Sequence, residues 1–256
     1  WFCRNPGLAL PLIALQYQEV RINLTLRNYS ELIISSTGGL IDNSPNKNPI
    51  SIESGNLEVD YIFLEENERK IFTKNNLQYL VEQLQVYATS LEPKNGDIQG
   101  SQIVNFTFNH PVKELIWVIQ NTNVLTTYPY GGNEWFNFST KPYENGKITS
   151  IDTMYEAKFV IEGQDLTDYK QNKYYKTVVP YQRHTNTPNN FIYVYSFSFH
   201  PEEYQPSGSI NFSRIDNSVL DFKLNSEIEN PIMQLFAVNY NILNICEGMA
   251  GIEYSN

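Results

Sequence analysis

The sequence predicts a mainly β protein, an antiparallel sandwich with a short helical insertion. Alternating apolar and polar residues recur along most of the chain, a pattern typical of strands with one buried face. Tyr and Phe number 18 and 14 among 256 residues, and both favour half-buried pleated surfaces. Turn-rich stretches of uneven length separate the alternating runs, which favours a sandwich over a small barrel of tight hairpins.

The first third of the chain divides into two alternating segments and a linker. Residues 12–28 read LIALQYQEVRINLTLRN, and Val20 to Leu26 alternate strictly, which predicts a long strand with one buried and one solvated face. Residues 35–56 are rich in Gly, Ser, Asn and Pro and lack periodicity, so they are expected to form a linker at a domain boundary. Residues 57–64, LEVDYIFL, alternate again and predict the first strand of a second unit.

The helical insertion is expected in residues 65–86. Acidic residues come first, where negative charge suits a helix N-terminus, and an apolar stripe follows at Leu77, Leu80, Val81 and Leu84. Asn75 and Asn76 are expected to separate two short helices. Beyond this point the sequence predicts strands at IVNFTF, ELIWVIQ, EAKFVI, IYVYSFSF, SINFSRI, VLDFKL and MQLFAVNYNILNI.

The net charge, the cysteines and the glycosylation sequons bear on which partners and which compartment are expected. The net charge is −10 without a basic stripe, and phosphate backbones require clustered Lys and Arg, so direct nucleic-acid binding is not expected. Cys3 and Cys246 lie at opposite ends, which indicates a reducing compartment rather than a disulfide framework, and Cys246 is expected to be buried in the last strand. N-glycosylation sequons, most simply incidental, occur at Asn23, Asn28, Asn105, Asn137 and Asn211.

No residue pattern predicts catalysis or cofactor binding. His110, His184 and His200 stand outside any metal-ligand spacing. A triad of Ser213, His200 and Asp216 can be drawn, but Ser213 lies in an alternating run without the turn that exposes a nucleophile. The glycines at 131–132 lack the lysine and the following helix that phosphate binding needs. The sequence therefore predicts no catalytic, cofactor-binding or metal-ligating residue and a protein that is not an enzyme.

Two stretches leave alternatives open. The run HPEEYQPSGSINFSRIDN, residues 200–217, is predicted to be a strand exit, a rigid turn fixed by Pro201, Pro206 and Gly208, and a returning strand. Tyr128, Tyr130 and Trp135 either close the top of the sandwich or form a sugar-stacking platform, which would make the protein a carbohydrate-binding module. A glycoside hydrolase, which needs two suitably spaced carboxylates, is the weakest alternative.

The chain resembles the major capsid proteins of nucleocytoplasmic large DNA viruses. The resemblance lies in WFCRNPGLALPLIALQYQEVRINL (residues 1–24), YLVEQLQ (79–85), HPVKELIWVIQ (110–120) and residues 200–217, in the same order as in the family. It marks 79–85 as a helix segment and 110–120 as a strand. The Asn-, Ile- and Tyr-rich composition is consistent with an AT-rich genome, such as that of a giant virus of protists.

The resemblance implies a double jelly roll that assembles as a homotrimer. Residues 1–34 would be the closing strands of the first jelly roll, residues 35–56 the linker and residues 57–256 the second jelly roll. Trimers with a pseudo-hexagonal outline would tile an icosahedral shell, contacting neighbouring capsomers and minor capsid proteins, with glycans on surface loops as a further expectation. The protein would reside in the virion and be assembled in the host cytoplasm.

Overall fold

The computed structural model describes residues 1–32, 52–92, 101–126, 132–141, 151–225, 227–228 and 230–254. Its helices are α1 (Tyr29–Leu32), α2 (Glu66–Lys74), α3 (Asn123–Thr126) and α4 (Val179–Arg183), with shorter helical turns at Pro6–Leu8, Leu12–Ala14, Tyr174–Val178 and Phe212–Arg214. None of the helices in these ranges is both long and apolar enough to cross a membrane.

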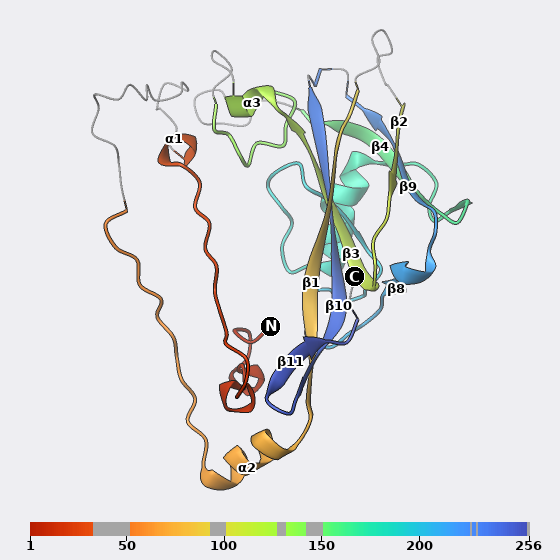
Figure 1. Ribbon diagram of the computed structural model, residues 1–256. Coiled ribbons are helices and arrows are strands. Elements are labelled where there is room, and N and C mark those ends of the chain that lie inside the picture. The colour runs from red at the N-terminus through yellow and green to blue at the C-terminus, as the bar shows by residue number, and fades with distance from the viewer. Residues whose placement is uncertain are drawn as a thin grey trace. The chain divides into compact units, whose positions relative to one another are not determined.

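The described strands form two antiparallel sheets (Figure 1). The six-stranded sheet has the order β1–β10–β3–β7, with β11 paired to β10 and β8 to β3; the five-stranded sheet has the order β2–β9–β4–β5, with β6 paired to β4. The strand bounds are β1 (Leu77–Ser90), β2 (Ser101–Phe106), β3 (Pro111–Asn121), β4 (Met154–Ile161), β5 (Gln164–Asp165), β6 (Lys170–Gln171), β7 (Tyr193–Ser196), β8 (Ile210–Asn211), β9 (Ser218–Leu224), β10 (Pro231–Cys246) and β11 (Met249–Ile252). The mainly β, antiparallel fold class is therefore confirmed.

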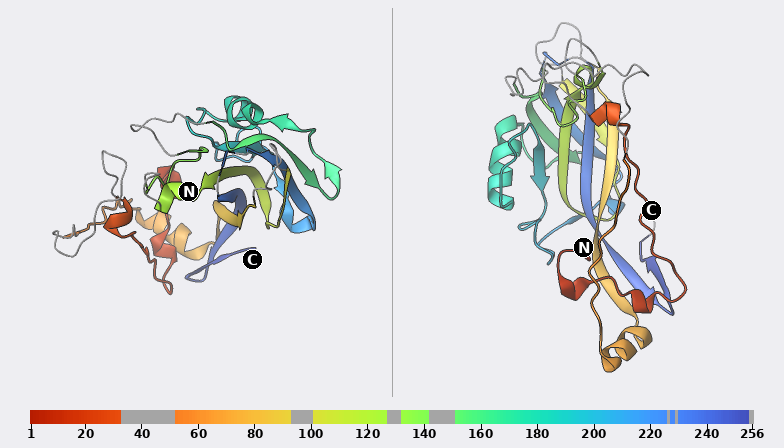
Figure 2. Two further views of the ribbon diagram at one scale, coloured as in Figure 1. Left: turned by 90° about the horizontal axis from the view of Figure 1, so that it is seen from above. Right: turned by 90° about the vertical axis from the view of Figure 1, so that its left-hand side faces the viewer.

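The chain divides into two compact units. Unit 1 comprises residues 1–26, 49–83 and 240–256, and unit 2 comprises residues 27–48 and 84–239. The two sheets face one another in unit 2 (Figure 2), while the first residues of β1, the last residues of β10 and all of β11 belong to unit 1. A small cluster of Ala14, Leu15 and Ile245 forms the centre of unit 1.

Aromatic packing dominates the core of unit 2. Trp117 of β3 is fully buried, and its ring centroid lies 5.4 Å from that of Phe159 on β4 and 5.1 Å from that of Tyr175. Tyr193 of β7 stacks on the same indole at 5.7 Å. Edge-to-face and offset pairs of this kind are worth about 0.5–1.5 kcal/mol beyond the area they bury, so the Tyr and Phe content of the sequence supplies the centre of the sandwich.

Most of the predicted strands are present where alternation places them. Buried and partly exposed residues alternate along β9 and along β10 from Pro231 to Asn239, as expected for a sheet with one face in the core. In β3 most residues of both faces are buried. β10 and β7 pair with its two edges, opposite Trp117 at Leu235 and at Tyr193. The predicted strand SINFSRI is shorter than expected, because β8 ends at Asn211 and a helical turn follows.

The predicted helix of residues 65–86 is only half correct. Its first part is α2, whose start is stabilised by the Glu65 N–H, which donates to the Glu68 carboxylate at 2.9 Å. The second part, including the segment 79–85 that the resemblance marks as helix, is wrong: residues from Leu77 onward form β1. Pairing with β10 overrides the helical spacing of the leucines, since tertiary context routinely outweighs local propensity.

The predicted strands at 12–28 and 57–64 are also wrong as regular elements. Residues 12–14 form a helical turn, and residues 18–28 and 57–64 belong to neither helix nor strand. The side chains expected on the buried face of the first segment are exposed, from 48% at Val20 to 79% at Leu24. Alternation indicates a strand, but a strand forms only where another strand is available to satisfy its backbone N–H and C=O groups.

Candidate functional site

The connection between β7 and β8 contains the HPEEYQPSGS stretch, and its residues 197–208, called the 197–208 loop, hold a cluster of polar contacts. Its two ends are tied together by Ser207: the Ser198 and Ser207 hydroxyls lie 2.7 Å apart, and the His200 N–H donates to the Ser207 hydroxyl at 2.7 Å. The loop is also fixed to β3, because the N–H groups of Phe197 and Ser198 both donate to the Lys113 carbonyl. The predicted turn is therefore confirmed.

Gly208 closes this loop at a point where a side chain does not fit. Its φ is +140°, a region that L residues rarely adopt. A Cβ atom at this position would lie 2.6 Å from the carbonyl oxygen of Phe197. The backbone of the 197–208 loop thus approaches itself closely, and the expected role of Gly208 in relieving this contact is confirmed.

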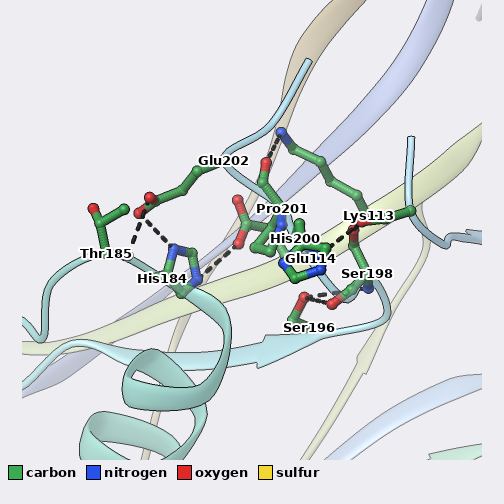
Figure 3. Close-up of polar contacts among 10 residues, drawn as sticks. Lys113, Glu114, His184, Thr185, Ser196, Ser198, His200, Pro201 and Glu202 are labelled. Carbon is green, nitrogen blue, oxygen red and sulfur yellow. Dashed lines mark hydrogen bonds and ion pairs between the residues drawn. The ribbon is translucent and has the colours of Figure 1, made fainter. Parts of the chain in front are cut away.

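A buried ammonium group supports the middle of the loop. Lys113 of β3 is 2% exposed, and its Nζ donates to the carbonyl of Pro201 at 2.5 Å (Figure 3). Buried ammonium groups are costly unless hydrogen-bonded. The hydrogen bond to the Pro201 carbonyl therefore offsets part of the cost of burying the Lys113 ammonium, and it fixes the position of Pro201, which is itself buried.

His184, the C-cap residue of α4, lies between two carboxylates (Figure 3). Its Nε2 lies 3.2 Å from Oε2 of Glu114 on β3, and its Nδ1 lies 3.1 Å from Oε1 of Glu202 in the loop. The His184 and Glu114 side chains are only 14% and 8% exposed, whereas Glu202 is 42% exposed. The Thr185 N–H adds a hydrogen bond to Oε2 of Glu202 at 3.1 Å.

The protonation of His184 follows from these contacts. The contact with Glu114 is the largest influence and raises the pKa of His184 above its ordinary value of 6.5; burial opposes it, and Glu202 adds to it. Burial raises the pKa of Glu202, but hydrogen bonds from Thr185 and His184 outweigh burial, and the pKa falls below its usual range. The cluster is therefore built around an imidazolium held by two carboxylates.

Ser213, the nucleophile of the hypothetical triad, has a structural hydrogen bond. The Ser213 hydroxyl accepts a hydrogen bond from the His110 N–H at 2.8 Å, and Ser213 lies in the helical turn Phe212–Arg214 rather than in the predicted strand. His110 is buried with a φ of +66°, at the turn that precedes β3. Across the described ranges, no group of three or more His, Cys, Asp or Glu side chains is arranged to hold a metal ion.

The aromatic platform is described only at Trp135, since Tyr128, Tyr130 and Gly131 lie outside the described residues. The Trp135 Nε1–H donates to the Glu31 carbonyl at 2.7 Å, and the Arg27 guanidinium lies 3.9 Å from the ring centroid. A pocket of about 320 Å³ adjoins it, lined by Arg27, Gln120, Thr122, Leu125, Trp135, Phe136, Ile232 and Gln234. One face of the indole is therefore already covered by a cation.

The cysteines and sequons are placed as follows. Cys3 and Cys246 are both exposed and free, so the expectation that Cys246 is buried is wrong: it is the last residue of β10, at the start of the hairpin to β11. Asn137 is 1% exposed, whereas Asn105 and Asn211 are exposed. The Asn137 amide donates to Glu134 and to the Lys141 carbonyl.

Sequence reasoning missed the His184 cluster. No sequence pattern marks His184 as part of a cluster, because its partners come from β3 and from a loop that the sequence does not place beside α4. One signal was present: Glu202 belongs to the polar stretch already singled out. Its partner across the fold could not be identified without the pairing of β3 and β7, which aligns Glu114 with Ser196.

Comparison with known proteins gives consistent matches along the chain. A family model described as large eukaryotic DNA virus major capsid protein matches residues 68–251, and one described as major capsid protein N-terminus matches residues 1–65. The whole chain is 35% identical to the major capsid protein of Phaeocystis pouchetii virus and 36% identical to that of Pyramimonas orientalis virus. It covers 64% and 60% of the length of these relatives.

A solved structure resembles the fold over nearly the same extent. The quasi-atomic model of the PBCV-1 virus capsid matches with a TM-score of 0.71 and 29% identity, over 99% of this chain and 68% of that chain. The similarity therefore extends to the strand arrangement as well as to the sequence.

Proposed function

The chain belongs to the family of the large eukaryotic DNA virus major capsid proteins, and on that premise we propose that it is a structural subunit of a virion shell. The observation that carries the proposal is the ordered match of both capsid models to a chain that folds as an antiparallel two-sheet sandwich. The described polar clusters are compatible with this role, because their hydrogen bonds tie backbone segments together. The proposed role is structural rather than enzymatic.

The proposed domain division is 1–34, closing strands of a first jelly roll; 35–56, linker; and 57–256, second jelly roll. The exposure of Val20, Ile22, Leu24 and Leu26 supports it. These side chains alternate with Arg21, Asn23 and Thr25 on an extended segment, which is the pattern of a strand that buries one face in a sheet. In the complete protein, strands from another part of the polypeptide would pair with this segment and cover its apolar face.

The proposed assembly is a homotrimer of pseudo-hexagonal outline that contacts neighbouring capsomers in an icosahedral shell. Minor capsid proteins are proposed as further partners, and the host cytoplasm as the place of assembly. The internally bonded 197–208 loop suits this role, since a loop that is already ordered loses little conformational entropy when identical neighbours pack around it.

The carbohydrate-binding alternative receives less support. Stacking on a sugar requires an open aromatic face, and the Trp135 indole is already engaged by Arg27 on one face and by the Glu31 carbonyl at Nε1. The capsid proposal therefore stands alone.

The assembly is tested by expressing the complete gene and measuring the mass in solution by size exclusion with light scattering. We expect a mass of three chains that does not change over a wide range of protein concentration. A persistent monomer at high concentration would refute the proposed trimer.

The domain division has its own test in a matched pair of substitutions. In the complete protein, Leu24→Asp should destabilise by about 2–4 kcal/mol because it buries a charge, whereas Thr25→Asp on the opposite face should change the stability by no more than about 0.5 kcal/mol. In the 256-residue chain, where both side chains are exposed, the two substitutions should have equally small effects. Equal effects in the complete protein would contradict the division.

A further inference from the structure

The contacts around His184 combine three separate segments of unit 2. The imidazole belongs to the end of α4, Glu114 belongs to β3, and Glu202 belongs to the 197–208 loop. One ring therefore joins a helix end, a strand and a loop (Figure 3). Any change in the charge of this ring acts on all three segments at once.

The geometry requires two N–H donors from one ring. Nδ1 faces Glu202 and Nε2 faces Glu114, and each carboxylate only accepts hydrogen bonds when ionised. A neutral imidazole has a single N–H, so its other nitrogen would direct a lone pair at a carboxylate oxygen. Nε2 of His184 and Oε2 of Glu114 are both buried, and neither meets hydrogen-bond geometry with a group among the described residues, so their 3.2 Å contact is an ion pair.

The other charged groups nearby do not replace this contact. On α4 itself, the Arg183 guanidinium lies over the ring of Phe199, 4.8 Å from its centroid. On β3, the Lys113 ammonium donates to the Pro201 carbonyl. In the loop, the side chains of His200 and Glu203 are exposed to solvent. The Glu114 and Glu202 carboxylates are therefore the charges that face the imidazole directly.

We propose that His184 is a proton-dependent latch, whose imidazolium form holds the 197–208 loop against β3 and the end of α4 and whose neutral form releases it. The contact between His184 and Glu202 is the one that breaks, because Glu202 is 42% exposed and can be solvated by water, whereas Glu114 is 8% exposed. The Lys113 and Ser207 contacts hold the centre and base of the loop independently of His184. Release therefore loosens the side of the loop next to Thr185 while the sandwich stays folded.

The direction with pH follows from the raised pKa of His184. A group whose pKa is raised by folding stabilises the folded contact fully at pH values below its unfolded pKa, and this stabilisation is lost as the pH rises through the folded pKa. The latch is thus closed in acid and opens towards alkaline pH. The midpoint lies above 6.5, the ordinary pKa of the imidazole.

The test uses the backbone amide of Thr185, which donates to Glu202. Hydrogen-exchange protection of this amide is measured from about pH 6 to about pH 9, with each rate corrected for intrinsic exchange, while NMR of the His184 ring reports its titration. We expect protection to fall in step with the ring titration. Amides of β3 and β10 should keep their protection throughout, which separates loop release from unfolding.

Variants make the assignment specific. In His184→Gln, the pH dependence of the Thr185 amide should disappear, and in Glu203→Gln, which removes an exposed charge from the same loop, it should match the unsubstituted chain. Glu114→Gln should move the midpoint to lower pH by more than Glu202→Gln does, because Glu114 is the larger influence on the histidine. Protection that stays flat through the ring titration, or an unchanged pH dependence in His184→Gln, would overturn the proposal.

If His184→Gln does not fold, Glu202→Gln alone decides the matter, because its partly exposed side chain can be replaced at small cost. A lower midpoint of the Thr185 amide in this variant supports the latch. An unchanged midpoint refutes it.

Discussion

Replacing Gly208 with alanine tests how tightly the 197–208 loop closes on itself. Two costs add in this substitution. The backbone is held at a φ of +140°, and strained angles of this kind cost about 1–3 kcal/mol for a residue with a side chain. The new methyl group would also lie 2.6 Å from the Phe197 carbonyl oxygen, a backbone atom that cannot rotate away, and such overpacking adds about 1–3 kcal/mol.

The sum predicts that Gly208→Ala lowers the free energy of unfolding by about 2–6 kcal/mol. Gly163 offers a matched control, since its φ is also positive, at +75°, but apart from its chain neighbours no atom lies within 4 Å of the place a Cβ would occupy. Gly163→Ala therefore carries only the backbone cost, about 1–2 kcal/mol. Both glycines belong to unit 2, so the same unfolding transition reports on both.

The assay is urea unfolding followed by tryptophan fluorescence, with Trp117 in the core as the principal reporter. The midpoint of Gly208→Ala should fall well below that of Gly163→Ala at an unchanged slope, because an unchanged slope indicates the same exposed surface on unfolding. If Gly208→Ala yields no folded protein while Gly163→Ala folds, the result agrees with the prediction that Gly208→Ala is the less stable variant. Equal midpoints for the two variants would refute the close approach at Gly208.

Three further predictions concern the packing of the core, the loss of stability at alkaline pH and N-glycosylation. Trp117→Ala should lower the free energy of unfolding by about 3–5 kcal/mol, because it empties a fully buried aromatic site; urea unfolding followed by circular dichroism measures this, since the variant lacks the fluorescent reporter, with the partly exposed Trp135→Ala as the milder control. Burial raises the pKa of Tyr175 to about 12, so the folded state retains this proton and loses stability between about pH 10 and pH 12; Tyr175→Phe should show a shallower loss in the same interval. Expressed in a glycosylating host, the chain should carry no glycan at the buried Asn137, while Asn105 is accessible; intact mass and peptide mapping decide this, and a glycan on Asn137 would contradict its placement.

The strands of the sandwich were predictable because their own sequences specify a buried face. In β9 the alternation of Leu220, Phe222 and Leu224 with polar residues coincides with the alternation of burial. The same logic failed for β1, where leucines spaced three and four apart also fit a helix. The deciding information lies in β10, far along the chain, so no local reading of residues 77–90 could have supplied it.

The polar site was predictable in outline but not in its partners. Pro201, Pro206 and Gly208 indicate a rigid turn from their backbone preferences alone, and the structure confirms that turn. The ties between the loop and the rest of the fold involve Lys113, Glu114 and His184, which reach it through strand pairing and through the placement of α4. Charged residues at these positions look like ordinary solvated residues until the fold is known.

The resemblance of this polar stretch to an active site has a physical cause. A catalytic site and a fixed loop both need polar groups held in one geometry, and both therefore concentrate His, Ser, Glu and Lys. They differ in where the hydrogen bonds go. In the 197–208 loop the Ser198 and Ser207 hydroxyls bond to each other, and Lys113 donates to a backbone carbonyl. These groups bond to partners within the fold, and the same residue types serve here to hold the loop in place.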